Sequence, residues 1–164
     1  MIAAALNEDI LIEKVDDFLA PFGVDSDFDS DFSYDPTEER VYFTILISER
    51  SDRLFKEYIT THFNFENFNI FVMSLLHEVG HFYTLDNFSK EKRKEDKRLK
   101  RNIEKQLTKN DSDEVYSSYF DLDIEKAATA WAVDYYKNNF ERCEKFFTDF
   151  VAVLNNEYHK IGLI

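Results

Sequence analysis

The stretch Ser74–Leu85, "SLLHEVGHFYTL", places two histidines and a glutamate in an otherwise apolar segment. His77 and His81 are four residues apart, so on a helix their imidazoles lie on one face, one turn apart. Two imidazoles in that arrangement can bind one ion. The alternative is a buried helix in which both histidines only have ordinary hydrogen-bond partners.

Glu78 completes a recognisable pattern. It follows the first histidine and lies about 100° further around a helix, so it can reach a water on the ion without binding the ion. This His-Glu-x-x-His spacing is that of zinc metalloproteases, in which the glutamate is the general base. An unpaired glutamate would be expensive to ionise among the apolar residues of this segment, which favours the metal site over the buried helix. Gly80 removes a side chain between the histidines and helps another element to approach.

A catalytic zinc ion usually takes three protein ligands. The chain's other histidines, His62 and His159, do not fit the metzincin continuation of the motif, because positions 84 and 87 hold Thr and Asn. A carboxylate is therefore the better third ligand.

Glu125 is the carboxylate that we expect to bind. In "YFDLDIEKAATAWAVDYY" (119–136) it shares a helix face with Ala128 and Ala132, whose small side chains let this helix pack on the motif helix. Asp121, one turn earlier, is either a ligand or a partner for a histidine N–H. Asp123 and Glu114 are weaker candidates.

"HEVGH" followed about 45 residues later by "EKAATAWA" resembles the ImmA/IrrE family of zinc-dependent peptidases, over roughly residues 40–135. The resemblance implies a small α+β zincin fold with a short sheet before the active-site helix. It implies that His77, His81 and Glu125, a gluzincin-type third ligand, bind Zn²⁺ and that Glu78 activates a zinc-bound water. Members of the family are often encoded by mobile elements or act in stress responses, and some cut a repressor protein.

The rest of the chain predicts a mostly helical α+β fold in a single zincin-like domain, 1–164. Phe28, Phe32 and Tyr34 fall at alternating positions on one face of a strand, and residues 41–47 are β-branched or aromatic almost throughout. With Asp35-Pro36 as the turn between them, they predict a short antiparallel hairpin over about 27–48. Apolar periodicity and only 3 Gly and 2 Pro favour long helices. We expect them over about 7–20, 52–62, 66–85, 89–107, 121–139 and 141–160.

Composition limits the function. Hydrophobic residues make up 44% of the 164, which excludes a disordered chain, and a net charge of −13 makes a nucleic-acid partner unlikely. The segment from Lys90 to Lys105 is the exception, with nine basic and four acidic residues. We interpret about 89–110 as a charged helical insertion, either solvated or in contact with an acidic partner. A lone cysteine, no apolar run for a membrane span and a poor signal peptide favour the cytoplasm.

The sequence therefore predicts a zinc-dependent peptidase that hydrolyses a peptide bond in a specific protein substrate. It does not choose the group that stabilises the oxyanion. The candidates are Tyr83, Tyr116, Tyr119, Arg142 and His159. Two alternatives stay open: a zincin-fold binding or regulatory protein without peptidase activity, acting on a host or mobile-element partner, and a structural helical domain in which the motif is accidental.

Overall fold

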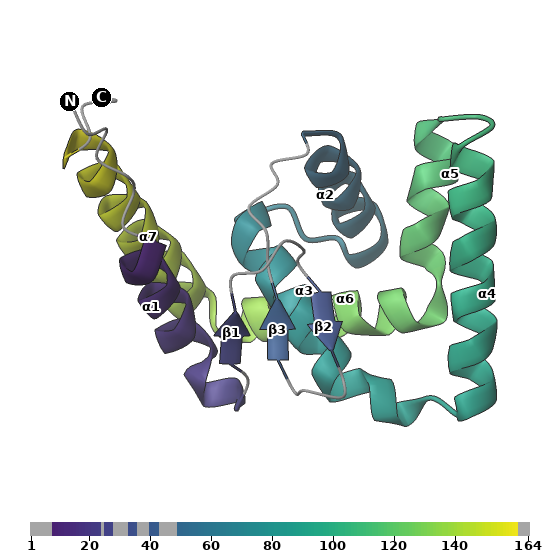
Figure 1. Ribbon diagram of the computed structural model, residues 1–164, viewed down its shortest axis with the longest axis horizontal. Helices are drawn as coiled ribbons and strands as arrows, with labels where there is room; N and C mark the ends of the chain where they lie inside the picture. Colours follow the sequence, from purple (N-terminus) through teal and green to yellow (C-terminus); the bar gives the residue numbers. More distant parts are fainter. Residues whose placement is uncertain (1–7, 24, 28–32, 36–39, 43–48, 161–164) are drawn as a thin grey trace. The chain divides into compact units, whose positions relative to one another are not determined.

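The structure, a computed structural model, describes residues 8–23, 25–27, 33–35, 40–42 and 49–160 (Figure 1). The chain forms two compact units. One comprises residues 1–44 and 139–164, and the other comprises residues 45–138. This division does not test the prediction of one domain over 1–164, which stays a prediction.

The first unit pairs two helices, α1 and α7. Helix α1 spans Glu8–Leu19 and α7 spans Phe140–Lys160. A 3-10 turn, η1 (Ala20–Phe22), follows α1 where Pro21 stops the helix, and Gly23 closes it in the left-handed region at φ 70°. The two helices pack through apolar side chains, with the rings of Phe18 and Phe146 stacked 4.2 Å apart.

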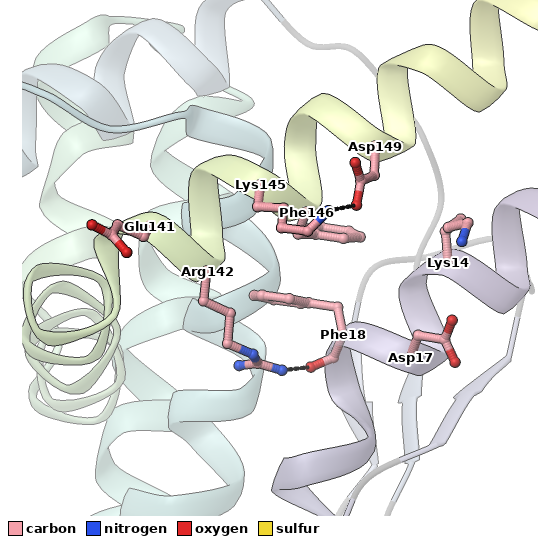
Figure 2. A pocket seen from close by; sticks show the side chains of 8 residues that line it. All are labelled: Lys14, Asp17, Phe18, Glu141, Arg142, Lys145, Phe146 and Asp149. Atoms are coloured by element: carbon pink, nitrogen blue, oxygen red, sulfur yellow. Dashed lines mark hydrogen bonds and ion pairs between the residues drawn. The ribbon is translucent and has the colours of Figure 1, made fainter.

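A pocket of about 480 Å³ lies beside this stacked pair (Figure 2). Arg142 crosses it to donate a hydrogen bond to the backbone carbonyl of Phe18, and its guanidinium lies 4.6 Å from the Phe18 ring centroid. Arg142, named above as an oxyanion candidate, is thus engaged within the first unit.

The predicted α+β class is wrong. Seven α-helices make up most of the described residues, and the strands are three segments of three residues each, β1 (Asp25–Asp27), β2 (Ser33–Asp35) and β3 (Arg40–Tyr42). They form a mixed sheet in the order β1-β3-β2. Strands β2 and β3 pair antiparallel within the range 27–48 where the hairpin was predicted, and β1 adds a parallel neighbour that was not predicted. Residues 28–32, 36–39 and 43–48 of that range lie outside the described residues.

The second unit holds the motif, and its described residues form only helices. They are α2 (Glu49–Phe63), α3 (Ile70–Thr84), η2 (Leu85–Asn87), α4 (Lys90–Leu107), α5 (Asp113–Ser117), η3 (Ser118–Asp121) and α6 (Asp123–Asn138). The helices predicted from periodicity are all found, with ends shifted by a few residues. Other helices, chiefly α6, pack on α3, the helix that carries the motif, so no sheet is needed to bury α3.

The core of the second unit lies between α3 and α6 (Figure 1). Helix α3 begins at Asn69, whose side chain accepts a hydrogen bond from the Val72 N–H at 3.2 Å. The Asn69 N–H in turn donates to the Tyr136 hydroxyl at 2.8 Å, which ties the start of α3 to the end of α6. No described helix is long and apolar enough to cross a membrane.

Candidate metal centre

Two histidines and one glutamate converge between α3 and α6. The Nε2 atoms of His77 and His81 lie 3.1 and 3.2 Å from the same atom, Oε2 of Glu125. His77 and Glu125 are buried, at 8% and 7% exposed, and His81 is partly buried. The three residues that the sequence singles out as ligands therefore form one cluster.

Gly80 lets the two helices come close enough for this cluster. A Cβ at Gly80 would stand 2.4 Å from the carbonyl oxygen of Ala128 and 3.0 Å from its Cα and carbonyl carbon. Because these are backbone atoms of a helix, they cannot rotate away. The close packing of α6 on α3, predicted from Gly80 and the small residues of α6, is confirmed.

The spacing of the three ligand atoms suits a metal ion. Two atoms that bind one zinc ion at about 2.05 Å with a tetrahedral angle lie about 3.3 Å apart. The two nitrogen–oxygen separations of 3.1 and 3.2 Å are close to that value, and all three ligand atoms lie within 4.8 Å of one another. The buried His-His-Glu group could therefore hold a divalent ion.

Thr129 fixes which nitrogen of His77 faces the cluster. The Thr129 hydroxyl donates its only proton to the backbone carbonyl of Glu125 at 2.9 Å. Its oxygen lies 3.1 Å from Nδ1 of His77, so it accepts a hydrogen bond from an Nδ1–H. The lone pair of a neutral His77 then lies on Nε2, the atom that points to the cluster.

The second carboxylate oxygen of Glu125 is held separately. The Tyr119 hydroxyl donates to Oε1 at 2.6 Å, and Nζ of Lys100 donates to that hydroxyl at 3.3 Å. The Lys100 ammonium also lies 4.9 Å from the centroid of the Tyr119 ring. Glu125 therefore offers one oxygen to the cluster while the other is bound, which favours a single metal–oxygen bond.

Asp96 of α4 holds the start of the ligand helix. Asp96 is 4% exposed, and its Oδ2 accepts a hydrogen bond from the backbone N–H of Ile124 at 2.9 Å. The other oxygen, Oδ1, makes no hydrogen bond with the described residues but lies 3.2 Å from Nζ of Lys92, which compensates the charge. A carboxylate at this helix end is also favoured by the helix dipole. Asp96 thus positions the turn that carries Glu125.

Electrostatics keep Glu125 ionised. Burial by itself raises the pKa of Glu125, but the adjacent imidazoles of His77 and His81 together outweigh it and hold the pKa well below its usual range. Burial by itself lowers the pKa of His81, but the hydrogen bond to Glu125 and the charges of Glu78 and Glu125 leave that pKa raised. An ionised carboxylate is the form that a metal ligand needs.

Glu78 lies next to this cluster, and its pKa is shifted in the opposite direction to that of Glu125. Burial raises the pKa of Glu78, and the charges of His81 and His77 offset this only in part. A carboxylate with a raised pKa accepts a proton more readily than one with an ordinary pKa. Two carboxylates therefore meet the histidines with pKa values moved in opposite directions.

The structure places the remaining candidates in different surroundings. Asp121 accepts a hydrogen bond from the Tyr58 hydroxyl at 3.2 Å rather than from a histidine N–H. Tyr83, at 44% exposed, stacks on the ring of Trp131 at 4.9 Å. His159 belongs to α7 in the first unit. Tyr119 contacts a cluster ligand, Glu125.

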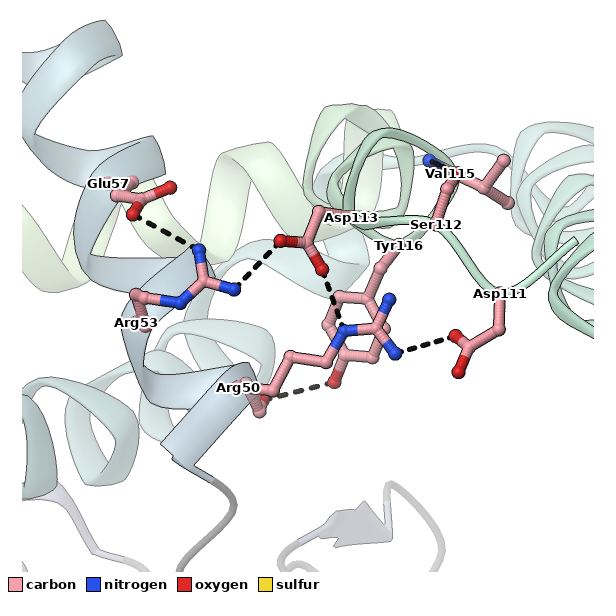
Figure 3. Close-up of polar contacts among 9 residues, drawn as sticks. Arg50, Arg53, Glu57, Asp111, Ser112, Asp113, Val115 and Tyr116 are labelled. Carbon is pink, nitrogen blue, oxygen red and sulfur yellow. Dashed lines mark hydrogen bonds and ion pairs between the residues drawn. The ribbon is translucent and has the colours of Figure 1, made fainter.

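Tyr116 takes part in a contact between α2 and the start of α5 (Figure 3). Its hydroxyl donates to Ser51 Oγ at 3.1 Å, and the Arg50 guanidinium lies 5.4 Å from its ring centroid. Arg50 also bonds Asp111 at 2.6 Å and Asp113 at 2.8 Å. This network holds helices of the second unit together and leaves Tyr116 engaged away from Glu125.

Three contributors are not singled out by the sequence: Thr129, Lys100 and Asp96. Thr129 had a signal, because it follows Glu125 by four residues and so lies on the same helix face. Lys100 and Asp96 had none, because each is one charge among many in the segment from Lys90 to Lys105.

Neither a family model, nor a curated protein, nor a solved structure matches this chain. The likeness to the ImmA/IrrE peptidases therefore rests on the motif residues, and the buried cluster of His77, His81 and Glu125 is consistent with it.

Proposed function

We propose that this protein is a zinc-dependent peptidase in which His77, His81 and Glu125 hold the ion and Glu78 is the general base. The observation that supports the proposal most directly is the convergence of three ligand atoms from two helices beside a fourth, base-like carboxylate. A structural helix would need neither a second histidine on the same carboxylate oxygen nor a threonine that sets the tautomer of the first.

Zinc, when bound, would supply a Lewis acid that polarises the scissile carbonyl and makes water acidic enough to attack near neutral pH. Glu78 would take the proton of the attacking water and deliver it to the leaving amine. Tyr119 is engaged with Glu125, so in this proposal it orients the ligand rather than the substrate. The substrate is a protein or peptide, as the pattern around Glu78 suggests.

The first test is the metal content of the purified protein after incubation with zinc and removal of the excess. We expect about one zinc ion per chain in the wild type, bound through three protein ligands as in other catalytic sites. His77→Ala and Glu125→Ala should each lose it, with unchanged circular dichroism. An absence of zinc in the wild type would contradict the metal centre itself.

The second test separates hydrolysis from metal binding. Glu78→Gln keeps the shape of the side chain but cannot accept the proton, so it should retain zinc and lose cleavage. New protein N-termini would be mapped in cells that express wild type or Glu78→Gln. If the wild type creates none that the variant lacks while zinc is bound, the protein is a metal-binding regulator rather than a peptidase.

A further inference from the structure

Helix α4 carries a row of positive side chains along one face, which we call the basic stripe. At 100° per residue, its six members fall within an arc of about 100° and extend over about 22 Å of helix. All six are exposed. They are Lys90, Lys94, Lys97, Arg98, Arg101 and Lys105.

The described residues do not neutralise the stripe. Within the described residues no member forms an ion pair, although the chain has 33 acidic and only 20 basic residues. Other cations of the same helix do form ion pairs: Lys92 bonds Asp123 at 2.6 Å, and Arg93 bonds Asp86 at 3.1 Å. The uncompensated charge is therefore concentrated on one face of α4.

The opposite face fixes the helix in place. Asp96 is buried and caps α6, and Leu99, Ile103 and Leu107 are partly buried. Because this inner face is anchored, the helix that carries the stripe is held in place. A partner would not have to fold this helix, which lowers the cost of binding.

The chemistry of the stripe selects among acidic partners. Single-stranded nucleic acid is usually held by aromatic side chains that stack on bases, and α4 contains none. A helix in the major groove of duplex DNA meets phosphates on both sides, across a groove about 12 Å wide. Here Glu91 and Glu104 stand at the two borders of the stripe and would repel phosphates there. A single narrow chain of carboxylates fits the arc better.

We propose that the basic stripe is a docking surface for an acidic segment of another protein, with carboxylates that follow the row of cations. The surface lies on the face of α4 opposite to Asp96. It does not depend on a metal ion, so it stands apart from the proposed peptidase activity. Its contacts are exposed ion pairs, which weaken as salt screens them over about 8 Å at physiological ionic strength.

The test uses the full chain and a fluorescein-labelled 16-residue peptide of alternating Glu and Ala, followed by fluorescence anisotropy. We expect binding at 50 mM salt that weakens at 500 mM, and no binding of the matched Gln–Ala peptide. Replacing Lys97, Arg98 and Arg101 with Gln, which forms helices about as well, should weaken binding about tenfold, since one exposed ion pair contributes about twofold.

The matched control removes the same charge elsewhere. Lys56, Lys109 and Lys126 are exposed and lie outside the stripe, and replacing all three with Gln should leave peptide binding within about twofold. Circular dichroism would verify that both triple variants are folded. Absence of peptide binding by the wild type, or equal losses in both variants, would overturn the proposal. So would tighter, stripe-dependent binding of a 16-base-pair DNA duplex, which would assign the surface to nucleic acid.

Discussion

Replacing Gly80 with alanine tests the close packing on which the candidate metal centre depends. In a helix without close neighbours this change stabilises by about 1 kcal/mol, because alanine has the higher helix propensity. Here the added Cβ would stand 2.4 Å from the Ala128 carbonyl oxygen, so α3 and α6 must separate by about 1 Å to restore ordinary contact. Overpacking against backbone that cannot rotate away costs about 3 kcal/mol, which leaves a net loss of about 2 kcal/mol.

The same separation disturbs the ligands. Moving α6 by about 1 Å would extend the distance from His77 Nε2 to Glu125 Oε2 from 3.1 Å to about 4 Å. Protein metal sites tolerate deviations of only about 0.2 Å in bond length, so we expect zinc affinity to fall at least about tenfold. Thermal unfolding without metal would measure the stability loss, as a drop in Tm of about 6 °C. Competition with a chromophoric chelator would measure the affinity.

Ser74→Ala is the matched control, because it adds helix propensity on the same helix α3 without building a new Cβ. It should stabilise by about 0.5 kcal/mol and leave zinc affinity unchanged. If Gly80→Ala is instead more stable than the wild type by about 1 kcal/mol and binds zinc equally well, α3 and α6 do not touch at this position.

Three further predictions concern the surroundings of the ligands and the buried thiol. Thr129→Val removes the acceptor of the His77 Nδ1–H and should lower zinc affinity about 10- to 100-fold in a chelator competition. An unchanged affinity would mean that a group other than Thr129 sets the tautomer of His77. Asp96→Ala leaves the partly buried N–H of Ile124 without its acceptor and should lower the free energy of unfolding in urea by about 1–3 kcal/mol. A loss below about 0.5 kcal/mol would contradict the cap. Burial raises the pKa of the Cys143 thiol to about 12, so the native protein should resist a thiol reagent at pH 8 and react once unfolded. Because the pKa of Cys143 is higher in the folded than in the unfolded protein, its contribution to stability is complete below the ordinary thiol pKa and is lost as pH rises from there toward 12. Rapid labelling of the native protein would contradict the burial.

The helices were predictable because their signals are local. Periodic apolar residues and the scarcity of glycine and proline identify the long helices, including α3 and α6, and dense charge identifies α4. The antiparallel pairing of β2 with β3 was predictable in the same way, because two segments of β propensity flank a turn signal. The parallel neighbour β1 was not, because the pairing of distant strands depends on partners that a single segment does not reveal.

The candidate ligands were predictable for a different reason. A helix fixes the spacing of His77 and His81. A metal site needs a third ligand, and Glu125 is a carboxylate on a helix whose small residues allow close packing. The groups that orient them arise from tertiary contacts. Tyr119 reaches Glu125 across the junction of η3 and α6, and no spacing rule predicts which of nine tyrosines does so.

Helix α4 shows what charge counting cannot resolve in one segment. By composition it is a uniformly charged helix, and we interpreted it as an insertion between the two motifs. In the structure its charges divide by face: Asp96, Lys92 and Lys100 point toward α6, η3 and Tyr119, while the basic stripe faces away. The two faces should therefore be separable by substitution, because they share no partner in the part of the chain that the structure describes. Asp96→Ala should weaken zinc binding and leave the acidic peptide bound, and the stripe variant should do the reverse; a variant that changes both together would mean that α4 couples its outer surface to the metal centre.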